Sequence, residues 1–132
     1  MPYAVLPDVD QALIDYLRTY PALTALHGGR VGTRLASGTT PAVRVTSLGG
    51  GQPWPWEGTP EFQVEWWGGT DLQAKTLARV GEAALWGFRG PIPGGRVTGG
   101  SVALSQLWSP DDTSGRARFI TQSSFIVHPE AS

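Results

Sequence analysis

The two histidines are the side chains of this sequence best suited to acid–base or metal chemistry. His27 precedes a Gly-Gly pair, and His128 lies near the C-terminal end. Neither belongs to an H-E-x-x-H or H-x-x-E-H pattern, which would place metal ligands on one face of a helix. No serine lies in a G-x-S-x-G nucleophile elbow. We expect both histidines to be solvent-exposed at the ends of their elements. A small hydrolase that uses His27 or His128 is one alternative function.

Neighbouring carboxylates offer another possible chemistry, because two of them can bind a cation or act as acid and base. Asp111 and Asp112 are adjacent, and Asp8 and Asp10 lie close together near the start. Aspartate is favoured at these places for local reasons, since it caps helices and closes turns. The sequence contains no cysteine, so thiolate metal sites and disulfides are impossible. We therefore predict no metal site.

Three consecutive glycines, Gly49, Gly50 and Gly51, invite comparison with phosphate-binding loops. A P-loop requires the pattern G-x-x-x-x-G-K-[ST], in which the lysine and the hydroxyl contact phosphate and Mg²⁺. Here the glycines lead into Gln52-Pro53, with no lysine and no helix start. A dinucleotide-binding fingerprint fails for the same reason. The sequence therefore predicts no cofactor.

Tryptophan is abundant, with six residues in the chain. Exposed tryptophans can stack on sugar rings, so the alternative function is a Trp-dependent carbohydrate-binding module. Such modules are usually all-β, and the long helix predicted below argues against that alternative. Trp66 fits the core face of a strand, and Trp86 lies on the predicted helix beside Leu85.

The composition fits one folded domain whose surface carries little charge. The chain has 132 residues, 40% of them hydrophobic and only 16% charged, with a formal net charge of −1. About a quarter of residues are charged in a typical soluble domain, so the low fraction favours burial of surface by a partner. There is no basic stripe for nucleic acid and no polybasic membrane anchor. No signal peptide or spanning segment is evident, so we expect the protein in the cytoplasm of the cell that makes it.

Periodicity and capping residues predict two main helices. Asp8 and Gln11 form a capping box before an apolar stripe, and Pro21 separates a further helical turn at 21–27. Thr70 and Gln73 form a second capping box, followed by about eighteen helical residues. Gly81 lies in the middle of this helix, where glycine costs about 1 kcal/mol relative to alanine. A close approach of the helix to a sheet would explain it.

Alternating segments predict strands at 30–34, 42–48, 61–67, 96–108 and 116–128. A polar loop at 109–115 joins the last two strands into a hairpin, in which Gly99-Gly100 suggests a bulge. The predicted order is α-β-β-β-α-β-β. The fold class is therefore α+β: a single domain with a mixed, mostly antiparallel sheet of four to five strands and two main helices packed on one face.

This order resembles the tail terminator and tail-completion (head–tail joining) proteins of long-tailed bacteriophages, a family characterised by element order rather than by catalytic residues. The resemblance covers most of the chain, and its most specific part is the strand-to-helix passage VEWWGGTDLQA at 64–74. Further similar segments are the opening helix at 12–17, PALTAL at 21–26, GRV at 29–31, PAVRV at 41–45, FQVEWWG at 62–68 and the helix at 74–85.

The resemblance implies a structural virion protein and no enzyme. Members form a ring, here expected to contain six subunits, at the head-proximal end of the tail tube. The ring ends tail polymerisation and presents a docking surface to the head connector or neck protein. Its partners would be further copies of itself, the tail tube protein and the connector. DNA would pass through the lumen without specific binding, and no membrane is involved.

The Gly/Pro/Trp segment 49–60 is predicted to be a flexible arm that contacts a neighbouring subunit or the tail tube. The glycines provide a hinge, and the prolines stiffen the residues beyond it. Either one of Trp54 and Trp56 enters a partner's pocket, where tryptophan is a common anchor, or both fold back on their own sheet. The predicted interface residues are Gly49, Gly50, Gly51, Pro53, Trp54, Pro55 and Trp56 in the arm, with Asp111 and Asp112 in the projecting loop.

Overall fold

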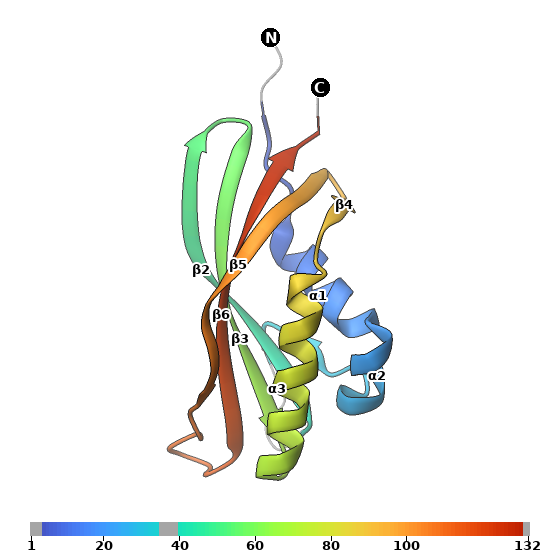
Figure 1. Cartoon of the computed structure of the whole chain (residues 1–132), viewed down its shortest axis with the longest axis vertical. Helices are drawn as coiled ribbons and strands as arrows, with labels where there is room; N and C mark the ends of the chain where they lie inside the picture. The colour runs from blue at the N-terminus through green and yellow to red at the C-terminus, as the bar shows by residue number, and fades with distance from the viewer. Residues whose placement is uncertain (1–3, 35–39, 131–132) are drawn as a thin grey trace.

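The computed structural model describes residues 4–34 and 40–130, and Figure 1 shows how its elements are arranged. The described chain forms an α+β single domain with three helices and a six-stranded sheet. The elements in chain order are α1 (Val9–Thr19), α2 (Pro21–His27), β1 (Val31–Gly32), β2 (Ala42–Trp54), β3 (Glu57–Gly68), α3 (Asp71–Trp86), β4 (Gly90–Ile92), β5 (Gly95–Trp108) and β6 (Ala117–Pro129).

The predicted helix starts are confirmed by side-chain caps. The Asp8 carboxylate accepts a hydrogen bond from the Gln11 N–H at 3.1 Å, and the Thr70 hydroxyl accepts one from the Gln73 N–H at 3.1 Å. Each cap satisfies a backbone donor that has no partner within the helix. Pro21 begins α2, as expected from its missing N–H, so α1 and α2 are separate helices.

The six strands form one mixed, mostly antiparallel sheet in the order β1-β2-β3-β6-β5-β4. The β1–β2 pair is parallel, and all other neighbours are antiparallel. The fold class is confirmed in its layers and in its mostly antiparallel sheet. The sheet is larger than expected, because the short β4, which lies outside the strands predicted from the sequence, pairs with the start of β5.

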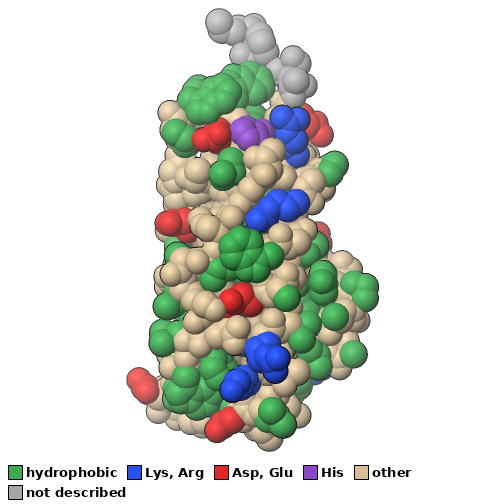
Figure 2. Space-filling view, in the orientation of Figure 1, with side chains coloured by type: hydrophobic (Ala, Val, Ile, Leu, Met, Phe, Trp, Pro, Cys, Tyr) green, Lys and Arg blue, Asp and Glu red, His purple; other side chains and the backbone are tan. Residues whose placement is uncertain are grey.

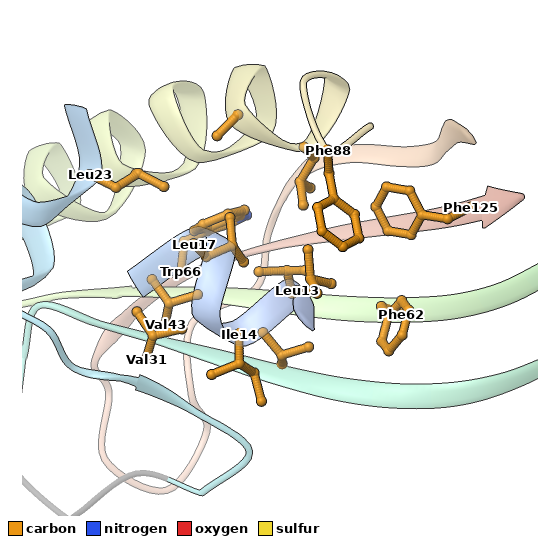
Figure 3. Close-up of a cluster of buried hydrophobic side chains, with 14 of the residues drawn as sticks. Leu13, Ile14, Leu17, Leu23, Val31, Val43, Phe62, Trp66, Phe88 and Phe125 are labelled. Carbon is orange, nitrogen blue, oxygen red and sulfur yellow. The ribbon is translucent and has the colours of Figure 1, made fainter. Parts of the chain in front are cut away.

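All three helices cover one face of the sheet, and the core lies between these two layers (Figures 1 and 3). Phe62, Val64 and Trp66 alternate along β3 and are fully buried against the helices. Their intervening neighbours Gln63 and Glu65 lie on the opposite face, as the alternation predicts. That opposite face has no helix over it in the described part of the chain.

Gly81 marks the closest approach of α3 to the sheet. A Cβ at this position would overlap the Trp66 indole, which is completely buried. The indole also donates a hydrogen bond from its Nε1 to the Thr121 hydroxyl at 3.0 Å, so its position is fixed from both sides. The close approach predicted for Gly81 is confirmed, with Trp66 as its cause.

The sequence suggested that the Gly/Pro/Trp segment 49–60 is an arm between two short strands, but in the structure both strands extend into it. β2 continues to Trp54 and β3 begins at Glu57, so most of 49–60 is a paired β-hairpin. The local composition was misleading, because glycine and proline are depleted in strands. Pairing with the facing strand overrides that preference.

Smaller differences concern the lengths of elements. α3 spans 16 residues and ends at Trp86, while β1 covers only two of the five residues predicted at 30–34. Phe88 lies just after the end of α3 and is buried in the core. None of the helices in the described ranges has the length and apolar character needed to cross a membrane.

Candidate interaction surface

The hairpin formed by β2 and β3 projects beyond the helices at one end of the molecule (Figure 1). Gly49, Gly50 and Gly51 pair with Glu61, Pro60 and Thr59 of the facing strand. The Thr59 hydroxyl lies 3.1 Å from both the N and the O of Gly51. The hairpin thus holds the predicted arm residues in a defined arrangement.

Among the three consecutive glycines, Gly50 occupies the position at which the hairpin most strictly requires glycine. Its φ is 138°, a conformation that side-chain-bearing residues rarely adopt. A Cβ there would also collide with the Thr59 carbonyl and approach the Pro60 Cα to 2.8 Å. The glycine therefore permits a close approach of two backbones.

Trp54 and Trp56 lie at the tip of this hairpin in different environments. Trp54 is 50% exposed, whereas Trp56 is half-buried. The Trp56 carbonyl accepts a hydrogen bond from Nδ1 of His128 at 2.9 Å, which ties the tip to β6. Pro53 and Pro55 are exposed beside them.

Asp111 and Asp112 lie at the opposite end of the sheet, in the loop between β5 and β6 (Figure 1). The Asp111 carboxylate accepts hydrogen bonds from the Ser114 hydroxyl at 2.6 Å and from the Ser114 N–H at 2.8 Å. These two bonds lower the pKa of Asp111 below its ordinary value of 3.8. The predicted interface residues therefore form two separate groups, and the structure gives Asp111 a role in closing its own turn.

His27 was expected to be exposed, and that expectation is wrong. Its ring is completely buried, where Nδ1 accepts a hydrogen bond from the Gly29 N–H at 2.9 Å. Nε2 must then carry the proton and donate it to the Leu17 carbonyl, also at 2.9 Å. His27 thus satisfies two backbone groups at neighbouring helix ends. His128 is half-buried and also makes structural contacts, through Trp56 and Thr98.

The carboxylates and histidines of the described residues do not gather into a metal-binding cluster. No cluster of three or more His, Asp or Glu side chains able to hold a metal is found within them. Asp8 and Asp10 line a hollow of about 460 Å³ between the start of α1 and the glycine run. Burial, and then the charge of Asp8, raise the pKa of Asp10.

A charged network on the helix-free face of the sheet was not anticipated from the sequence. Glu65 is 4% exposed although it faces away from the helices. Its carboxylate lies 3.6 Å from an Arg118 nitrogen and 3.8 Å from an Arg44 nitrogen, and accepts a hydrogen bond from the Trp67 indole at 3.1 Å. Arg118 also stacks over Trp67, with 5.1 Å to the ring centroid. The alternation along β3 placed Glu65 on this face, but only the pairing of β2, β3 and β6 brings its partners together.

Hydrophobic side chains form several separate groups on the face shown in Figure 2, with charged side chains between them. Trp54, Trp86 and Trp108 are each about half-exposed and belong to different elements. Trp108 packs on Phe119, with 5.0 Å between ring centroids.

The fold defined by these elements, a curled and mostly antiparallel sheet with helices on one side, also occurs in a solved virus-like particle. One similar chain belongs to a structure described as the virion of a native gene transfer agent particle. The two chains superpose with a TM-score of 0.68 over 91% of this chain and 94% of that one, at 17% sequence identity. No protein-family description and no curated protein matches the sequence. The likeness is therefore one of fold.

Proposed function

We propose that this protein is a structural component of a phage-like virion and that it works without catalysis. The observation that carries the proposal is the fold shared with a chain of a gene transfer agent virion over nearly the full length of both. The buried His27 and the turn-closing Asp111 support it, because both use their polar atoms to hold the fold. Both ring nitrogens of His27 are engaged by backbone groups, so this side chain is not free to act as the base or the acid of a hydrolase.

Within that class we propose the role of a tail terminator. The protein would form a ring of six copies at the head-proximal end of the tail tube, ending tail polymerisation and receiving the head connector. The support is the element order that this chain shares with tail terminators. The ring requires a heterologous contact, repeated until the rotation closes. The projecting hairpin, with the exposed Trp54 at its tip, is the proposed contact with a neighbouring copy or with the tail tube.

The helix-free face of the sheet suits the wall of a channel through which DNA passes. Arg44 and Arg118 on this face are both paired with Glu65, and Gln63 and Gln122 are hydrogen-bonded across strands at 3.2 Å. Strong DNA binding requires free Lys and Arg side chains that neutralise phosphates. A polar face whose arginines are paired with a carboxylate would let DNA slide without holding it.

Deletion of the gene from the element that encodes the particle tests this function. Cells lacking the protein should produce tails of abnormal length, or tails without heads, as seen by electron microscopy. Tails of normal length joined to heads would refute the proposal. Complementation with Trp54→Ala tests the hairpin tip, with Trp86→Ala as the matched control, because both side chains are about half-exposed. We expect Trp54→Ala to lower the yield of complete particles at least tenfold while the purified protein keeps its thermal stability.

A further inference from the structure

The sheet has two long outer edges that are largely free of strand partners. β1 covers the outer side of β2 only through the pairs Val31–Val43 and Gly32–Arg44. β4 covers the outer side of β5 only from Gly95 to Val97. Within the described ranges, 46–54 on β2 and 98–108 on β5 therefore have no strand on their outer sides. Backbone N–H and C=O groups on such edges are a template for pairing with another chain.

Both free edges lack charged residues. Residues 46–54 read TSLGGGQPW and residues 98–108 read TGGSVALSQLW, without a single Asp, Glu, Lys or Arg. The inner strands, by contrast, carry Glu57, Glu61 and Glu65 on β3 and Arg118 on β6. Proteins that remain monomeric commonly protect exposed edges with charge, above all lysine. This sheet has the reverse arrangement, which is expected when its edges are covered in the assembled state.

Between the bulges, each edge strand keeps a continuously paired segment, and the two segments lie at the same level of the sheet. Pairing is continuous over 49–51 on β2 and over 99–102 on β5. These segments face each other across the sheet, since Gly49 pairs with Glu61, Glu61 with Ser124, and Ser124 with Ser101. A neighbour related by rotation about an axis along the strands would bring them together.

Strand direction is also compatible with this contact. The four long strands β2, β3, β6 and β5 alternate in direction, so β2 and β5 run antiparallel to each other. When copies share one orientation in a ring, β5 of one copy and β2 of the next are antiparallel as well. The alternation therefore continues unbroken from copy to copy.

We propose that the ring closes by edge-to-edge pairing of β5 in one copy with β2 in the next, giving a continuous antiparallel barrel. This inference rests on the proposed ring. Four strands spaced about 4.8 Å apart span about 19 Å per copy. Six copies give a circumference of about 115 Å and a backbone-to-backbone diameter of about 37 Å, which strand tilt widens further. Such an opening is wider than duplex DNA.

Engineered disulfides test the contact without interference, because the chain has no cysteine of its own. Thr46→Cys or Ser47→Cys on β2 is combined with Ser101→Cys, Ala103→Cys or Ser105→Cys on β5. The six double variants sample both faces of the sheet and several registers. Particles made by cells carrying each variant are oxidised mildly and analysed by non-reducing electrophoresis.

We expect at least one double variant to give a ladder of covalent multimers that thiol reduction collapses, while single-cysteine variants stay monomeric. Two results would overturn the edge contact. One is rings visible on tail ends with no cross-linking in any of the six variants. The other is a single-cysteine variant that forms covalent dimers, since that indicates an isologous β2–β2 or β5–β5 pair. Absence of any ring on tail ends refutes instead the proposed function, and the edge contact with it.

A charge placed on the edge gives an independent measurement. Ser101→Lys adds an ammonium to the exposed β5 edge, and Ala83→Lys adds one to the exposed side of α3 as the matched control. Ser101→Lys should lower the yield of complete particles at least tenfold with an unchanged monomer melting temperature, while the control stays near the parent level. Equal yields from both variants would contradict a paired β5 edge.

Discussion

Substitution of Gly81 by alanine should destabilise the protein, although alanine is the better helix former. In an exposed helix the change would add about 1 kcal/mol to the free energy of unfolding. Here the added Cβ overlaps the buried Trp66 ring, and insertion of one carbon into a packed core costs about 1–3 kcal/mol. Since the indole is also held by Thr121, it cannot withdraw without loss of that hydrogen bond, which favours the upper half of that cost. After the gain in helix propensity is subtracted, we expect a net loss of about 1–2 kcal/mol.

Urea unfolding followed by tryptophan fluorescence measures this loss, with Ala83→Gly as the control for helix propensity. Ala83 is exposed on the same helix, so its change to glycine should cost about 1 kcal/mol from propensity alone. In a Trp66→Phe background the smaller ring leaves room, and Gly81→Ala should cost at least about 1 kcal/mol less than in the parent. A Gly81→Ala protein more stable than its parent, or an equal cost in both backgrounds, would refute the packing argument.

Three other substitutions test polar and backbone features. His27→Leu should lower the free energy of unfolding by about 1–3 kcal/mol, because the Leu17 carbonyl and the Gly29 N–H lose their partner; unchanged stability in urea would contradict the buried role. Gly50→Ala should lower the melting temperature by several degrees through its clash with Thr59, with Gly115→Ala as a control at a positive φ in open space. Asp111→Asn tests pH dependence: the folded pKa lies below 3.8, so the carboxylate contributes fully above that value and its contribution is lost as pH falls through the lowered pKa. NMR titration of the loop should therefore show an acid transition in the parent that is absent from Asp111→Asn.

Features that depend on neighbouring residues in the chain were predictable from the sequence. The caps at Asp8 and Thr70, the break at Pro21 and the alternation along β3 all derive from rules that act over a few residues. The role of Gly81 was also predictable, because an unfavourable residue inside a helix needs a packing reason. These rules were sufficient for the fold class.

Features that depend on contacts distant in sequence were not predictable. The hairpin at 49–60 consists of residues that disfavour strands, and only the facing strand gives them a partner. Nothing near His27 in the sequence indicated that it would contact the carbonyl of Leu17 on the preceding helix. The partners of Glu65 come from two other strands, one of which lies more than fifty residues away. In each case the topology of the fold supplies the missing information.

The glycine run is explained by the fold of one copy, whereas the uncharged edges point to assembly. The hairpin itself accounts for the glycines, through the positive φ of Gly49 and Gly50 and the contact of Gly51 with the Thr59 hydroxyl. A glycine substitution therefore damages the monomer before it reaches any interface. The absence of charge from 46–54 and 98–108 has no such backbone explanation, because most residues there are not glycine and several of their side chains, among them Ser47, Ser101 and Ala103, are exposed. Charge added at an edge, rather than bulk added at the glycines, is thus the perturbation that separates assembly from folding.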